Sequence, residues 1–428
     1  MNAALLSVSA LMGPDRREAD FLLSASPGPL EVVRDGCAAP PVRAHARFAD
    51  RETRGLFMPD HASDAPIQVR DLRRRIGALS LRLRTAGEKI KPAEPRFTDC
   101  DKIRLPGGEL VGRKKVIVMS GGCTVPTCTM CPFTNFNNYG LDDGSASESL
   151  LDQVRRTLTR TEAEPAYEVL SLYNDGSFFA PKEIPRDVQV EIARLVAAAG
   201  IKHLVVESLP QFVTEPVLAP FVQALRGVRL EIGIGLQSAD ELVRETLVNT
   251  RISQKSFERA LSVMTSLGVD PKIYLLIKPP FLSEGEAVTD VVESVDYLTG
   301  LGVRGMTLCP TRVSRHTVAW ELWQAGQYTP PNLWTVVEAV RRVHERLAVR
   351  VACVNLRGTD FESVFPDACP ACADTVVDAL MRFGESGDAG DLPADCSCWP
   401  PLKVTALDHA VVTARAAQQL NVLERAGV

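Results

Sequence analysis

The residues from Val116 to about Thr311 alternate six times between a short apolar run and a longer amphipathic stretch. The apolar runs are rich in β-branched residues, whereas the stretches between them place apolar residues at helical spacing. Strands that alternate with helices in this way are typical of a parallel sheet covered by helices. The sequence therefore predicts an α/β fold, a partial (β/α)6 barrel of the TIM type, in which functional residues follow the strands.

The expected elements divide the chain into three parts. Residues 1–112 form an N-terminal extension with a basic amphipathic helix at 68–91, whose arginines either touch an anionic substrate or RNA, or form a solvated face packed over the barrel. Residues 113–312 form the barrel, and residues 313–428 form a cysteine-rich C-terminal segment. The strands are expected at 116–119, 167–173, 203–207, 230–237, 272–277, 305–308 and 349–354, and helices at 147–158, 187–199, 253–267, 332–347 and 374–383.

Three cysteines, Cys123, Cys128 and Cys131, crowd the loop directly after the first apolar run. Gly121 and Gly122 allow the backbone to turn sharply there. Three thiolates are too few for a closed zinc site, which needs four ligands, but they suit an iron–sulfur cluster in which one iron stays open. The alternatives are three buried structural cysteines or an incomplete zinc knuckle.

This loop resembles the cluster-binding loop of radical S-adenosylmethionine (SAM) enzymes. It departs from the usual pattern in two places, because four residues separate Cys123 from Cys128 where three are usual, and Met130 replaces the usual aromatic residue before Cys131. The resemblance implies that the three cysteines hold a [4Fe-4S] cluster whose fourth iron chelates SAM. Cleavage of SAM would then produce a 5'-deoxyadenosyl radical that abstracts hydrogen from a substrate.

The resemblance also implies a set of SAM-binding residues at the ends of the following strands. The turn after the second strand stands where this family has a Gly-Gly-Glu motif, and there Asp175 supplies the acid for the SAM ammonium group. Residues at the next two strand ends are candidates to hydrogen-bond the ribose and methionyl groups. The full predicted set is Asn174, Asp175, Gly176, Ser177, Glu207, Gln237 and Ser238. No catalytic acid, base or nucleophile follows from the sequence.

The order of these motifs, with Lys-Pro-Pro-Phe at 278–281, most resembles the branch that contains the elongator catalytic subunit and the radical SAM subunit of archaeosine synthase. That branch implies carbon–nitrogen cleavage on a modified nucleoside or tRNA base. The net charge of −5 and the absence of an obvious RNA-binding module favour a small biosynthetic substrate instead. Further alternatives are radical sulfur insertion and, in another class, a zinc-stabilised binding protein without radical activity.

A second set of cysteines occurs as two short-spaced pairs, Cys369 with Cys372 and Cys396 with Cys398. Two such pairs can converge on one tetrahedral metal, so the sequence predicts zinc or an auxiliary iron–sulfur cluster near the barrel mouth. The alternatives are structural thiols or a redox disulfide.

The cysteine content and the hydropathy pattern define the expected surroundings of the protein. Eleven cysteines, several in short-spaced pairs, favour metal ligation in a reducing cytoplasm over a disulfide scaffold. No apolar run reaches 18 residues, so no membrane partner is expected. An electron donor such as flavodoxin or ferredoxin is the expected protein partner, because the cluster has to be reduced.

Overall fold

The structure is a computed structural model that describes residues 67–84, 94–105, 109–133, 144–160, 164–352, 363–399 and 401–428. The predicted extension before Ile67 lies outside these residues. The basic helix is present as α2 (Ile67–Arg82), and the part of its predicted range after Arg84 also lies outside the described residues.

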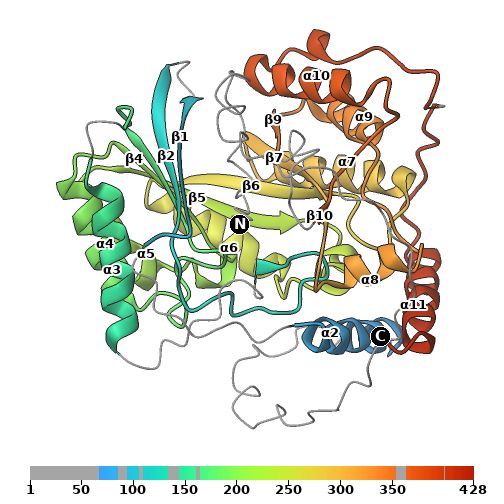
Figure 1. Ribbon diagram of the computed structural model, residues 1–428, viewed down its shortest axis with the longest axis horizontal. Coiled ribbons are helices and arrows are strands. Elements are labelled where there is room, and N and C mark those ends of the chain that lie inside the picture. The colour runs from blue at the N-terminus through green and yellow to red at the C-terminus, as the bar shows by residue number, and fades with distance from the viewer. Residues whose placement is uncertain are drawn as a thin grey trace, which may run out of the picture. The chain divides into compact units, whose positions relative to one another are not determined.

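Eight strands form one curled sheet in the order β1-β2-β3-β4-β5-β6-β7-β9 (Figure 1). Their bounds are β1 Phe97–Arg104, β2 Leu110–Ile117, β3 Val169–Tyr173, β4 His203–Glu207, β5 Arg229–Gln237, β6 Asp270–Ile277, β7 Gly305–Pro310 and β9 Ala348–Val351. β1 runs antiparallel to β2, and each later neighbouring pair is parallel. The carboxyl ends of β2 to β9 therefore share one edge of the sheet. A separate two-stranded sheet pairs β8 (Val313–Ser314) with β10 (Ser363–Val364).

Helices connect the parallel strands and cover one face of the sheet. They are α3 Gly144–Leu158, α4 Arg186–Ala198, α5 Glu215–Ala224, α6 Gln254–Ser266, α7 Glu284–Gly300, α9 Leu333–Val343 and α10 Ala373–Ser386, with 3-10 turns at Pro210–Phe212 and Ala389–Asp391. Side-chain caps define several starts: the hydroxyl of Ser253 accepts from Ser256 N at the start of α6, and Ser283 with Glu286 forms a capping box at the start of α7.

The two faces of the sheet differ in polarity, because successive side chains of a strand point to opposite sides. Leu172, Val206 and Ile234 are fully buried in the core shared with the helices. The other face carries charged residues that pair across strands: Arg113 on β2 binds Asp101 on β1, and Lys272 on β6 lies 3.7 Å from Glu231 on β5. The inner face of the half-barrel thus combines these charged pairs with a small apolar group, Val111, Ile117, Val169, Tyr173 and Val205.

A second core lies among α2, α8 (Val318–Gln324), α11 (His409–Arg425) and a π-helix at Leu242–Leu247. Arg75 of α2 donates to Asn421 and to both carboxylate oxygens of Glu424 on α11. Figure 1 shows α2 and α11 adjacent at the lower right. These contacts show that arginines of α2 hold the packed face of this helix, which favours the structural interpretation of its charge.

The predicted fold class is confirmed, and most predicted helices and strands are present with ends that differ by a few residues. The elements that were not predicted include the antiparallel edge strand β1, the π-helix, the helix α8 and the C-terminal helix α11. In the part of the chain that the structure describes, no helix is both long and apolar enough to cross a membrane.

Candidate functional site

The loop with the first three cysteines is held against the end of the π-helix. The hydroxyl of Thr129 donates to Leu247 O at 2.8 Å and its amide to Val248 O at 3.0 Å. The hydroxyl of Thr127 donates to Asn249 O at 2.9 Å, and both threonines are fully buried. Cys128 lies between these two residues, so hydrogen bonds of the protein itself position this part of the loop.

Burial raises the pKa of each of the three thiols, that of Cys128 to about 12. The three groups act on one another electrostatically, since Cys131 raises the pKa of both Cys123 and Cys128. Three cations oppose this effect: Arg84 lowers the pKa of Cys128 and of Cys131, Arg251 lowers that of Cys128, and Arg312 lowers that of Cys131. Binding of iron would therefore release protons from the thiols and place their negative charge beside arginines.

The spacing of these three sulfurs fits a cluster better than a single ion. In the described parts of the chain, the four C-terminal cysteines are the one group of three or more ligand atoms that all lie within 4.8 Å of one another. Cys123, Cys128 and Cys131 do not meet this criterion, although they lie within electrostatic reach of one another. A cluster spans several metal atoms, so its cysteines stand further apart than those around one ion.

The turn that follows β3 packs directly on the loop with Cys123, Cys128 and Cys131, the cluster loop. A Cβ added at Gly176 would lie 2.0 Å from Glu183 Oε2 and 3.3 Å from Cys123 Cα, so this position accepts only glycine. Asp175 adopts a left-handed conformation with φ of 52° and pairs with Arg96, the residue before β1, Oδ2 to Nη1 at 3.1 Å. The structure thus brings the predicted turn and the first cluster cysteine into contact.

Glu183 joins these two segments and was missed in the sequence. Its fully buried carboxylate accepts from the amide and hydroxyl of Thr124, from Asn174 Nδ2 at 3.2 Å and from the amide of Ser177. Its backbone carbonyl accepts from Gly121 N. Burial raises the pKa of Glu183 to about 7 against these hydrogen bonds. No motif marks this residue, because it lies between β3 and α4 and its partners come from two distant loops.

Glu207 ends β4 beside the same turn. Its carbonyl accepts from Phe178 N at 2.8 Å, and its carboxylate accepts from the hydroxyl of Tyr274 at 2.8 Å. Burial raises the pKa of Glu207 to about 7, and the charge of Asp175 acts in the same direction. Glu207 and Asp175 therefore lie within electrostatic reach of each other at the carboxyl edge.

Gln237 and Ser238 end β5, where the strand register shifts relative to β6. Gln237 has φ of 70°, and its Nε2 lies 2.3 Å from the position of a Cβ on Gly235, so the side chain folds back over that glycine. Ser238 is fully buried and its hydroxyl donates to Asp290 on α7. The Ser238 hydroxyl is thus engaged by the helical layer, and a role for either residue in SAM binding stays a prediction.

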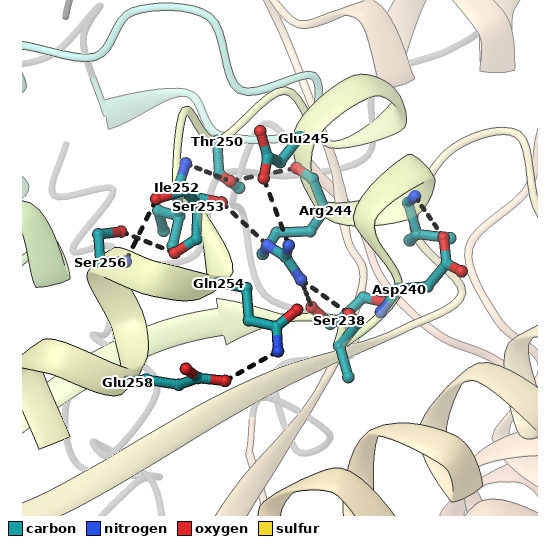
Figure 2. A network of polar contacts seen from close by, with 12 residues as sticks. Ser238, Asp240, Arg244, Glu245, Thr250, Ile252, Ser253, Gln254, Ser256 and Glu258 are labelled. Carbon is teal, nitrogen blue, oxygen red and sulfur yellow. Dashed lines mark hydrogen bonds and ion pairs between the residues drawn. The ribbon is translucent and has the colours of Figure 1, made fainter. Parts of the chain in front are cut away.

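Arg244 on the π-helix organises the segment after Ser238 (Figure 2). Its guanidinium, 1% exposed, donates to the carbonyls of Ser238, Ala239 and Ile252. These bonds satisfy carbonyls that leave β5 and enter α6. The network fixes the π-helix, and the π-helix in turn holds the cluster loop.

Asp290 gives this network a pH-dependent stability. Burial raises its pKa to about 8 from an ordinary value of 3.8, so the folded protein holds the proton more tightly than the unfolded chain. Its contribution to stability is therefore complete below about pH 4 and decreases as the pH rises toward 8, by up to about 1.4 kcal/mol per pH unit. We expect Asp290→Asn to reduce the fall in melting temperature between pH 5 and pH 8. Asp296→Asn, at an exposed position of the same helix, should leave that fall unchanged. Equal pH dependence in both variants would contradict the assignment.

Asp175 is expected to contribute to SAM binding without holding the cluster. Replacement by alanine removes a buried carboxylate, and a lost charge-assisted hydrogen bond corresponds to an affinity loss of about 10- to 100-fold. Calorimetry with the reconstituted protein measures this change, and iron content should be unaltered. Asp101→Ala serves as the control, because it removes a different buried ion pair, the one between Asp101 on β1 and Arg113 on β2. SAM affinity that is unchanged in Asp175→Ala, or equally weakened in both variants, would remove Asp175 from the site.

The four C-terminal cysteines form a compact group at the start of α10. The distances between sulfurs are 3.3 Å for Cys369 and Cys372, 3.6 Å for Cys372 and Cys398, and 2.8 Å for Cys396 and Cys398. Sulfurs around one tetrahedral zinc at bonds of about 2.3 Å stand roughly 3.8 Å apart, which is close to the first two of these distances, and the pair of Cys396 and Cys398 stands closer. Trp334 Nε1 donates to Cys372 Sγ at 3.3 Å, which ties the group to the start of α9.

A half-barrel of mostly parallel strands, with three cysteines in the loop after its first parallel strand, is the arrangement that the resemblance to radical SAM enzymes predicted. The names of the sequence relatives agree with this resemblance. Archaeosine synthase subunit beta of Methanosarcina acetivorans is 29% identical over 333 residues, 72% of this chain and 90% of the relative.

Two other relatives match over shorter spans. An uncharacterised protein of Methanocaldococcus jannaschii is 28% identical over 54% of this chain and 63% of its own length. Archaeosine synthase subunit beta of Thermococcus kodakarensis is 25% identical over 45% of this chain and 60% of its own length, so the chain spans less than two thirds of these two relatives. No family model matches the chain.

Solved structures with a similar arrangement include two named enzymes. Methylornithine synthase aligns with a TM-score of 0.41 at 11% identity, over 86% of this chain and 91% of that one. The Elp3 protein of Methanocaldococcus infernus aligns with a TM-score of 0.35 at 15% identity, over 48% of this chain and 51% of that one.

Proposed function

We propose that this protein is a radical SAM enzyme that modifies a nucleoside or a base in tRNA. The likeness to archaeosine synthase subunit beta carries the proposal for the substrate, since it extends over 72% of this chain. The contact between the cluster loop and the turn at 174–177 supports the proposal for the chemistry, because it joins the two segments that radical SAM enzymes use for the cluster and for SAM.

In this proposal Cys123, Cys128 and Cys131 hold a [4Fe-4S] cluster, and Asp175 binds the ammonium group of SAM. The bound cluster supplies one electron for the cleavage of SAM to methionine and a 5'-deoxyadenosyl radical. Glu183 positions the site, because it holds the cluster loop and the SAM turn in one arrangement. Glu207 is placed to accept hydrogen bonds from SAM hydroxyl groups beside the same turn.

A small biosynthetic substrate is the second candidate, and the net charge of −5 favours it because strong non-specific RNA binding requires positive charge. Radical sulfur insertion is a third, supported by the second cysteine group.

The names of the relatives support a partner subunit, and reduction of the cluster requires an electron donor such as flavodoxin or ferredoxin. The division of the chain at residues 112 and 312 also stays a proposal.

We further propose that Cys369, Cys372, Cys396 and Cys398 bind one metal ion. Their compact arrangement favours a single four-coordinate ion such as zinc over an auxiliary cluster, and four protein ligands leave no open position for substrate. The ion would join the starts of α9 and α10 to the segment at 393–399, which Arg341 also holds through the carbonyls of Pro393 and Ala394. The role of this metal is thus structural.

The proposed function is tested with protein reconstituted anaerobically with iron and sulfide and reduced with dithionite. Release of 5'-deoxyadenosine from SAM, measured by mass spectrometry, tests the radical chemistry. Unmodified tRNA and a mixture of free nucleosides are then added separately. We expect tRNA or nucleosides to increase the release above the substrate-free rate, and mass spectrometry of the digested RNA identifies the changed base. A protein that binds zinc but releases no 5'-deoxyadenosine would contradict the proposal and would indicate a zinc-stabilised binding protein without radical activity.

A further inference from the structure

Arg84, at the end of the basic helix, is attached directly to the cluster loop. Its Nε donates to the carbonyl of Pro126 at 2.6 Å, and Pro126 lies between Cys123 and Cys128. Its Nη1 is completely buried and has no hydrogen-bond partner among the described residues. The guanidinium therefore uses one donor to bind the loop and leaves another donor buried beside it.

A buried, unpaired donor on a charged group is costly, so its presence indicates a partner beyond the described residues. Burial lowers the pKa of Arg84, and the thiols of Cys131, Cys128 and Cys123 act in the opposite direction. All three cluster cysteines thus lie within the electrostatic field of this one cation. The unpaired donor thus belongs to a cation that acts on all three thiols, and a negatively charged, sulfur-rich ligand is a partner of the matching charge.

The neighbouring arginines of α2 hold the end of the helix in this position. Arg73 pairs with Glu245 on the π-helix at 3.6 Å, and Arg82 donates to the carbonyl of Val428 at 2.7 Å. Arg73 and Arg82 thus interact with groups of the fold itself. Arg84 instead faces the loop, so its position is set by a helix that is anchored at several points.

Asn249 places a second buried polar group next to the loop that carries the three cysteines. Its carbonyl accepts from Thr127, and its fully buried side-chain amide has no hydrogen-bond partner in the described structure. Its Nδ2 lies 3.3 Å from the position of a Cβ on Gly77 of α2. The space beside Cys128 therefore contains unsatisfied polar groups from two elements.

We infer that Arg84 donates a hydrogen bond to a sulfur of the bound cluster and that its charge raises the reduction potential of that cluster. Reduction adds one negative charge to the cluster, and an adjacent cation stabilises the reduced form more than the oxidised form. This inference rests on the proposed function. Arg84 is a positioning and tuning residue, because it acts through the cluster and not on substrate.

The test compares Arg84→Gln and Arg84→Lys with the wild-type protein, each reconstituted in the full chain without substrate. The midpoint potential is measured by titration with dithionite, followed by electron paramagnetic resonance of the reduced cluster. We expect Arg84→Gln to lower the equilibrium constant for reduction about tenfold, which is about 59 mV for one electron. Arg84→Lys keeps the charge and should recover most of this loss.

Arg74→Gln is the matched control, because it removes a charge from an exposed position of the same helix, paired with Asp71. Its potential should equal that of the wild type. An unchanged potential in Arg84→Gln at full iron content would overturn the inference and leave the proposed function intact. If Arg84→Gln binds no iron, Arg84→Lys decides: a wild-type potential supports the inference, and a protein that is also empty overturns it in favour of a folding role. A wild-type protein that takes up no cluster would overturn both proposals.

Discussion

Replacement of Cys123, Cys128 or Cys131 by alanine is expected to abolish the release of 5'-deoxyadenosine. Each cysteine supplies one of three ligands in the loop, and a cluster with two protein ligands is neither retained nor held with an open iron next to SAM. The loss should be complete within detection and accompanied by loss of most cluster iron. Liquid chromatography with mass spectrometry measures the product, and colorimetric iron analysis measures the cluster.

Cys100→Ala is the control for this experiment, because Cys100 is a half-buried free thiol on β1 and lies outside the loop. This variant should retain iron and activity. The fold should also survive the loop variants, since the loop is held by Thr127 and Thr129 and not by its thiols. Production of 5'-deoxyadenosine by the triple variant would show that the central assignment is wrong.

Replacement of Cys369 and Cys372 by serine is expected to remove one metal ion per chain and to lower the melting temperature. Zinc sites of this kind bind with apparent free energies of about 10–16 kcal/mol in small peptides, and much of that energy is used to fold the segment. The site here is attached to a large core, so we expect a loss of only a few kcal/mol. Mass spectrometry of metals and thermal unfolding with and without a chelator measure the two effects.

The metal is best identified in a variant that already lacks the three loop cysteines. One zinc per chain in that background, lost when Cys369 and Cys372 are also replaced, would support the single-ion site. Iron with sulfide would point to an auxiliary cluster instead. If neither metal is present and the chelator leaves the melting temperature unchanged, the four cysteines are structural thiols.

The periodic part of the fold could be predicted from local patterns. The strand at His203–Glu207 is observed with its predicted bounds, and the following strand ends at Gln237 as expected. Such strands are buried on a helix-covered face and are therefore continuous in apolar character. The polar residues that follow them mark the carboxyl edge of the sheet without any knowledge of tertiary contacts.

The edge strand β1 could not be recognised in the same way. Its inner-face residues include Asp99 and Asp101, which interrupt the apolar alternation of a strand. These acids become compatible with a sheet only because Lys115 and Arg113 of β2 stand opposite them. The helix α11 does carry a local signal, an N-cap residue at Asp408 followed by apolar residues at helical spacing, Val412, Ala416 and Leu420.

The sequence by itself determined the chemistry that this protein can support, because three cysteines after a strand and a Gly-Gly turn specify a sulfur-rich site by their spacing alone. It also predicted which strand ends would contribute to that site. Only the tertiary structure decided how the parts are joined: Glu183 links Thr124 to Asn174, and Arg84 reaches Pro126 from another helix. The reason is physical, since spacing along a chain records local geometry, whereas a buried carboxylate or guanidinium finds its partners among residues that are distant in sequence and become neighbours only when the core forms.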